Sequence, residues 1–166
     1  MHEKPANTRF WRRWAVAMAA AGAVLGLAVL PPFVPEAWQA VLMHAFSGVC
    51  HQLPERSPHW AGEAIAVCDR CIGIYAGLLL GIAGSGLIHT LLHKVHGYAP
   101  WFLGAILVPL GVDWLGPVLG WWSNTPVSRG ITGALVGLGA GALIVAALAN
   151  GVSAGTSPAG KEEKGA

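Results

Sequence analysis

All three cysteines of this chain lie between residues 50 and 71, and a histidine directly follows the first of them. Cys68 and Cys71 form a CxxC pair, which is the usual half of a zinc site. Cys50 and His51 would bring the ligands to four, the number in a closed tetrahedral site. Two adjacent residues reach one ion only through a bent backbone, so one of them could stay unbound and leave an open position. The residues predict a site for zinc or another transition metal on Cys50, His51, Cys68 and Cys71.

The same thiols also suit redox chemistry. A CxxC pair at a helix N-terminus has a lowered thiol pKa, because the helix dipole favours the thiolate. In an oxidising compartment, Cys50 would exchange electrons with a soluble partner, and Cys68 with Cys71 would pass them to a quinone in the bilayer. A third alternative is purely structural, with two cysteines in a disulfide and one free.

Helical spacing places Cys68, Cys71 and Tyr75 on one face, which makes them candidate catalytic residues. The CxxCxxxY segment that they define resembles the active-site helix of vitamin K epoxide reductases and their bacterial relatives. Those proteins are four-helix membrane bundles with a quinone near the CxxC. The chain departs from them in having one cysteine, Cys50, where those enzymes use a pair of shuttle cysteines.

Three charged residues complete the set of candidates: Asp113, Arg70 and Arg129. Asp113 is the only acidic residue inside an apolar stretch, where a carboxylate must be paired or protonated. It is therefore a candidate catalytic residue, or the proton-coupling group of a small transporter. The structural alternative is an ion pair of Asp113 with Arg70 or Arg129 that holds helices together. A scaffold subunit without chemistry of its own is a further alternative.

The composition places this chemistry in a membrane protein. Hydrophobic residues make up 54% of the 166 residues and charged residues 11%, less than half of the share of about 25% in soluble domains. The hydrophobic content excludes a disordered chain, and a net charge of +2 excludes a nucleic-acid-binding domain. The motifs of kinases and hydrolases are absent, and the sequence does not decide whether the chain is an enzyme.

Four stretches are long and apolar enough to cross the bilayer as helices. They are residues 15–34, 71–92, 101–121 and 131–148. The expected fold is all-α, an integral membrane four-helix bundle over residues 15–150. Residues 1–14 would form an N-terminal tail, and the polar residues 151–166 a disordered C-terminal tail. The length of the first stretch favours a retained helix over a cleaved signal peptide.

Basic residues set the expected orientation. Seven Lys and Arg residues lie on the side of the two termini, and three, Arg56, Arg70 and Arg129, lie on the other. By the positive-inside rule this predicts a multi-pass protein of the inner (plasma) membrane with both termini in the cytoplasm. The cysteine-containing loop over residues 36–70 then faces outward. Its residues 36–49 have apolar side chains at helical spacing and predict a short amphipathic helix in the outer interface.

Small residues predict how the second and fourth stretches pack. Glycines recur at every fourth position in both, as Gly73, Gly77 and Gly81 and as Gly133, Gly137 and Gly141. Such ridges let two helix backbones approach closely. At the cytoplasmic end of the second stretch, His89, His93 and His96 follow helical spacing; they predict polar caps at a helix end, with a second metal site as the alternative.

Taken together, the motifs resemble a family of prokaryotic membrane proteins known as domain of unknown function 2085. The similar residues are Cys50-His51-Gln52, residues 54–57, Cys68, Arg70-Cys71, Gly73-Ile74-Tyr75 and Gly77, followed by Asp113 and by blocks between residues 124 and 133. Trp114 stands where glycine is expected and Pro58 where an aromatic residue is expected. The resemblance implies a small integral membrane protein and no particular activity.

Overall fold

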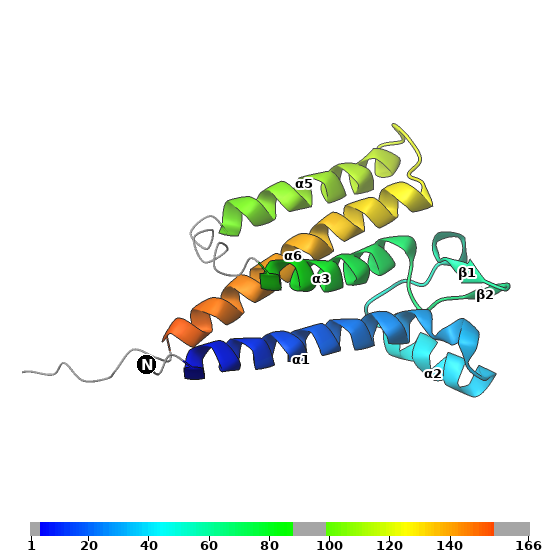
Figure 1. The fold of residues 1–166 in the computed structure, drawn as a ribbon. Coiled ribbons are helices and arrows are strands. Elements are labelled where there is room, and N and C mark those ends of the chain that lie inside the picture. Colours follow the sequence, from blue (N-terminus) through cyan, green and yellow to red (C-terminus); the bar gives the residue numbers. More distant parts are fainter. Residues whose placement is uncertain (1–3, 88–98, 155–166) are drawn as a thin grey trace, which may run out of the picture.

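The computed structural model of the chain describes residues 4–87 and 99–154, which form helices and one short hairpin (Figure 1). Four long helices lie side by side: α1 (Lys4–Val29), α3 (Asp69–Leu87), α5 (Ala99–Val118) and α6 (Pro126–Ala154). α3 packs against α6 and α1, and α5 packs against α6. Apart from the hairpin, the predicted helical fold class is confirmed.

Two described segments are long and apolar enough to cross a membrane, Thr8–Val29 and Pro126–Ala149. Gly104–Val118 within α5 is apolar but shorter than a membrane span. Pro109 and Pro117 lie inside α5 and do not interrupt it. α3 is not among the candidate spans; it begins with Asp69 and Arg70, and its described part ends at Leu87. Length and composition of the described residues thus support two of the four predicted spans.

Both ends of the described chain are more helical than the sequence suggested. α1 begins at Lys4, inside the predicted tail of residues 1–14, with Pro5 in its first turn, where no backbone donor is needed. At the other end, α6 continues to Ala154, inside the predicted disordered tail. Residues 155–166 and the predicted histidine cluster of His89, His93 and His96 lie outside the described residues.

α3 and α6 touch through two rows of glycine. The rows are Gly73, Gly77 and Gly81 on α3 and Gly133, Gly137 and Gly141 on α6. A Cβ atom added at Gly77 would lie 2.2 Å from the carbonyl oxygen of Ala134, and one at Gly137 would lie 2.1 Å from that of Ile74. No side chain fits at such distances, so the predicted packing through glycine ridges is confirmed.

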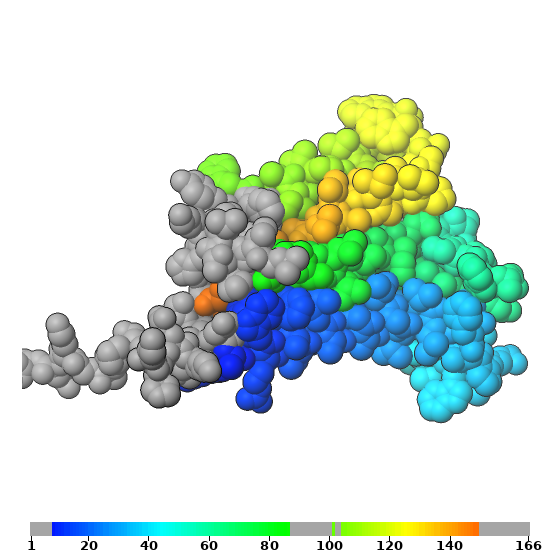
Figure 2. Space-filling view, in the orientation of Figure 1, coloured from blue at the N-terminus to red at the C-terminus, as the bar shows by residue number. Residues whose placement is uncertain are grey.

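The segment between α1 and α3 forms a cap on one end of the helices. It contains η1 (Pro31–Phe33), α2 (Glu36–Ser47), η2 (Pro54–Arg56), β1 (His59–Trp60) and β2 (Glu63–Ala64). α2 confirms the predicted helix to within two residues and contains no buried residue. In Figure 2, α2 and the α5–α6 turn project from opposite sides of this end of the molecule.

The sequence analysis predicted neither the hairpin nor the short helices η1 and η2. His59 pairs with Ala64 and Trp60 with Glu63. The turn residues Ala61 and Gly62 both have positive φ, 52° and 91°, as a two-residue turn between antiparallel strands requires. The Gln39 amide on α2 donates to the Glu63 carboxylate at 2.8 Å, which fastens the hairpin to the helix.

Candidate metal centre

The three cysteines meet where the cap joins α3. Their Sγ atoms all lie within 4.8 Å of one another, and all three are free thiols. Cys50 is buried, and Cys68 and Cys71 are half-buried. At a zinc–sulfur distance of about 2.3 Å, two sulfurs on a tetrahedral ion lie about 3.8 Å apart. The cluster can therefore close on one ion with small side-chain rotations.

The side chain of Gln52, two residues after Cys50, holds the backbone that carries Cys50. α2 ends at Ser47, and the Cys50 amide donates to the Phe46 carbonyl at 3.0 Å. Gln52 then adopts a left-handed conformation with φ 48°, which is unfavourable for a residue with a side chain. Its amide nitrogen donates to the carbonyls of Met43 at 2.7 Å and Ala66 at 2.8 Å. These two bonds fix the Cys50 segment between α2 and the approach to α3.

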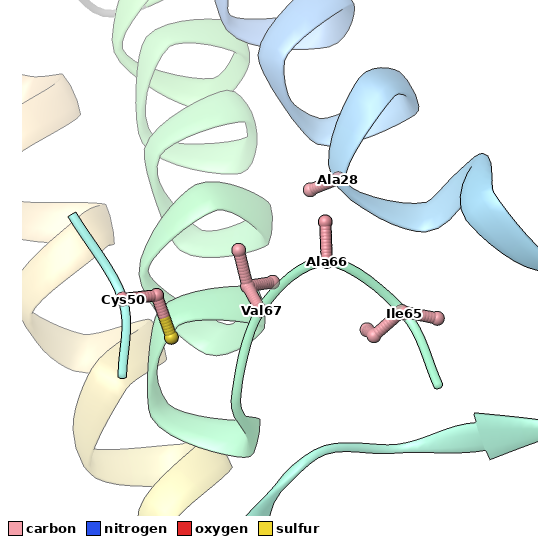
Figure 3. Packing of buried hydrophobic residues seen from close by; sticks show 5 residues of the cluster. All are labelled: Ala28, Cys50, Ile65, Ala66 and Val67. Atoms are coloured by element: carbon pink, nitrogen blue, oxygen red, sulfur yellow. The ribbon is translucent and has the colours of Figure 1, made fainter. Parts of the chain in front are cut away.

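The approach to α3 is held by buried apolar residues. Ile65, Ala66 and Val67 are buried, and the Ala66 amide donates to the Ala28 carbonyl at the end of α1 at 2.9 Å. Figure 3 shows Ala28 facing this segment, with Cys50 on the neighbouring loop. Cys68 follows immediately and sits one residue before α3, since its carbonyl accepts the amide of Ile72 at 3.0 Å.

Hydrogen bonds to sulfur connect the cysteines and favour the thiolate form of Cys68. The Cys68 amide donates to the Cys50 Sγ at 3.2 Å. A hydrogen bond from the Cys71 thiol lowers the pKa of Cys68 to about 5, although partial burial acts in the opposite direction. Since the thiolate is the form that binds metals, the lowered pKa of Cys68 favours metal binding.

The fourth predicted ligand, His51, lies beside the cluster and not in it. Among the described residues, only the three cysteines bring their ligand atoms within 4.8 Å of one another. His51 is exposed and lines a cavity of about 350 Å³ together with Cys68 and Cys71. Its role as a ligand stays a prediction. Tyr75 packs against the buried core of the cap next to Cys71, and its ring centroid lies 6.2 Å from that of Phe46.

Two ion pairs join α3 to the helices around it. Arg70 donates to the Asp113 carboxylate on α5. Arg129 on α6 donates to the Asp69 carboxylate from both Nη2, at 2.7 Å, and Nε, at 3.1 Å. The ion pair expected for Asp113 is thus present with Arg70. Arg129 instead pairs with Asp69, a residue to which the sequence analysis gave no role.

Asn124 connects the two pairs. Its side-chain nitrogen donates to Asp113 Oδ2 at 3.3 Å, and its side-chain oxygen accepts from Arg129 at 3.1 Å. The four charged groups and this amide form one continuous network around the first turn of α3, where Cys71 lies. This network ties the start of α3 to α5 and α6.

Replacing Asn124 with alanine is expected to lower the free energy of unfolding by about 1.5 kcal/mol, because hydrogen bonds to two charged groups are lost. Denaturant titration of the chain in detergent measures this. Ser123→Ala is the matched control, since Ser123 is the exposed neighbour in the same turn and should leave the stability unchanged. Equal stability of the two variants would contradict a network joined through Asn124.

Comparison with known proteins finds one matching family and two similar proteins. A family model described as "Predicted membrane protein (DUF2085)" matches residues 50–143, more than half of the chain, starting at the first cysteine. An uncharacterized protein of Methanocaldococcus jannaschii is 34% identical over 99 residues, which are 58% of this chain and 61% of that protein. An uncharacterized protein of Methanothermobacter thermautotrophicus is 32% identical over 96 residues, 57% of this chain and 82% of that protein. No solved structure matches the chain.

Proposed function

This chain belongs to the DUF2085 family of predicted membrane proteins, and on that premise we propose that it binds a transition-metal ion through Cys50, Cys68 and Cys71. It spans about three fifths of the first curated relative. The proposal concerns the site that this chain itself contains. Zinc is the ion that three thiolates with a histidine suit best.

One observation carries the proposal. Three thiols from two separate segments lie within 4.8 Å of one another, at a point held by Gln52 and by the buried residues before α3. Three thiolates this close repel one another, so the cluster would lose its remaining thiol protons only on binding a cation. A bound divalent ion removes that repulsion and replaces the hydration that the buried Cys50 has lost.

The fourth ligand decides what the ion can do. If His51 turns toward the cysteines, zinc has four protein ligands and the site is closed and structural. If His51 stays at the cavity wall, the ion has three protein ligands and can accept another molecule. The bound ion would supply Lewis acidity there.

We place the site on the outer side of the membrane. The basic residues concentrate at the opposite end of the helices, near the two termini, which the positive-inside rule assigns to the cytoplasm. α3 and α5 would complete four spans with α1 and α6. The exposed apolar side chains of α2, Trp38 and Val41, suit contact with the outer lipid interface.

The first test is the metal content of the wild-type chain, purified in detergent under reducing conditions and incubated with zinc before desalting. We expect one zinc ion per chain, and a thiolate-to-metal absorption band when cobalt is used instead. Chelation should return three thiols that react with a thiol reagent. A chain that holds no metal and three free thiols would overturn the proposal.

A second candidate is thiol oxidation, which the closeness of the Cys68 and Cys71 sulfurs favours. Formation of a Cys68–Cys71 disulfide would release two protons and two electrons, which would reduce a bilayer quinone to the quinol. The burial of Cys50, at 5% exposure, disfavours an exchange with a soluble partner, because exchange needs an accessible thiol. A metal-free chain with one reducible disulfide would move the proposal to this chemistry.

A further inference from the structure

Basic side chains line most of the polar wall of the cavity beside the cysteines. Arg56, Arg70 and Arg129 line it, and His51 stands with them. No acidic side chain is among the described residues that line it. Asp69 and Asp113 hold two of these arginines from outside the cavity wall, so that the guanidinium groups are fixed in place before anything binds.

Two of the arginines have hydrogen-bonding capacity left over. Arg70 donates to Asp113 through Nη2, while its buried Nε has no hydrogen-bond partner among the described residues. An unpaired buried donor is unfavourable, and Arg70 is also one of the residues that line the cavity. Arg56 is exposed and forms no ion pair within the described part of the chain.

The remaining wall is apolar. Leu53, Ile74 and Trp114 line the same cavity. Small-molecule sites commonly combine such surfaces with a few fixed polar groups that orient the ligand. A volume of about 350 Å³ admits a small organic molecule.

We propose that this cavity binds a small organic carboxylate, with its carboxylate on Arg56 and Arg70 and its apolar body against Leu53, Ile74 and Trp114. Guanidinium groups bind carboxylates through paired hydrogen bonds. A monoanion suits the position better than a dianion, because the half-buried thiols of Cys68 and Cys71 adjoin it. The cavity is present without a metal, so this inference does not rest on the proposed metal site.

Equilibrium dialysis of the full chain in detergent tests the inference, with labelled benzoate as the probe and benzamide as its uncharged match. Empty micelles correct for partition into detergent. We expect one saturable benzoate site per chain and at least about tenfold weaker binding of benzamide, since charged hydrogen bonds are lost. Equal binding of the two probes, or no saturable binding of benzoate, would overturn the inference.

Arg56→Gln gives the second readout. Arg56 is exposed, so the variant should fold, and benzoate should bind about fivefold or more weakly while benzamide is unaffected. Arg13→Gln, which removes an exposed arginine from α1 far from the cap, should change neither. Unchanged benzoate binding in Arg56→Gln would also overturn the inference. Dialysis of metal-free and of zinc-loaded chain separates the two proposals. Benzoate should also bind the metal-free chain, so a failure of the metal proposal would leave this result unchanged.

Discussion

Replacing Cys50 with serine is expected to lower the affinity of the chain for zinc by about a hundredfold or more. Structural zinc sites bind with about 10–16 kcal/mol, so one of four ligands accounts for about 2.5–4 kcal/mol, and each 1.4 kcal/mol is a factor of ten. A hydroxyl is a far poorer zinc ligand than a thiolate. Competition with a chromogenic chelator measures the affinity directly.

The three cysteine variants separate the metal and redox proposals. If one ion is shared, Cys50→Ser, Cys68→Ser and Cys71→Ser should all lose zinc to a similar extent, because each removes one thiolate from the same cluster. If the chain works as a dithiol, Cys50→Ser should keep a reducible disulfide between Cys68 and Cys71. Zinc affinity unchanged in Cys50→Ser would contradict a cluster of three ligands.

Histidine variants decide the fourth ligand with a control from the same segment. His51 and His59 are both exposed residues of the cap, but only His51 lines the cavity with Cys68 and Cys71. If His51 binds the ion, His51→Ala should weaken zinc binding and His59→Ala should not. Equal affinities would instead leave zinc with three protein ligands and an open position.

The sequence predicted the structure best where only one residue type can satisfy a physical requirement. Glycine at every fourth position of two apolar stretches predicted the contact of α3 with α6, because only the absence of a side chain lets two backbones touch. The CxxC pair and Cys50 were likewise predicted to share a site. For the cysteines, the spacing fixed only Cys68 relative to Cys71; Cys50 reaches them through tertiary packing.

The sequence limited the possible ion-pair partners of Asp113 but did not decide between them. A carboxylate in an apolar helix needs a partner, which limited Asp113 to Arg70 or Arg129. Which arginine it meets depends on the rotation of α3 and α6 about their axes. That rotation places Asp69, next to Arg70, against Arg129. A charge at the start of α3 between two cysteines was the signal that could have identified Asp69.

Local conformation was the least predictable part. The hairpin turn uses Ala61 and Gly62, whereas hairpin signals in sequences are Asn-Gly or Asp-Gly. Nothing in the sequence indicates a left-handed Gln52, since the conformation is held by hydrogen bonds to Met43 and Ala66, far apart in the chain. The position of His51 relative to the cysteines depends on that same bend, so its role as a ligand could not be derived from adjacency.

Replacing Gly77 with alanine is expected to lower the free energy of unfolding by about 3 kcal/mol, at the upper end of the usual effect of overpacking. The new Cβ would lie 2.2 Å from the carbonyl oxygen of Ala134 and 2.9 Å from its Cα. Both are backbone atoms of α6, which no rotamer change can move away. α3 and α6 must therefore move apart at this point and lose their close backbone contact. Denaturant titration in detergent, followed by circular dichroism, measures the loss.

Gly84→Ala supplies the control in the same helix with the same substitution. A Cβ at Gly84 meets nothing within 4 Å, so alanine there should leave stability unchanged or raise it by up to about 1 kcal/mol through its higher helix propensity. The propensity gain is common to both variants, so their difference isolates the contact. Equal stability of the two variants would mean that α3 and α6 do not touch at Gly77.

The Gly77 variant also connects the packing of the helices to the site. α3 carries Cys71 in its first turn and α6 carries Arg129, which holds Asp69 beside that turn. If α6 moves away from α3, the Asp69–Arg129 pair lengthens and the buried charges lose part of their mutual stabilisation. We therefore expect weaker zinc binding in Gly77→Ala than in Gly84→Ala, although neither glycine lines the cavity. Unchanged zinc affinity together with lowered stability would show that the cap alone, through Gln52 and the residues before α3, positions the three thiols.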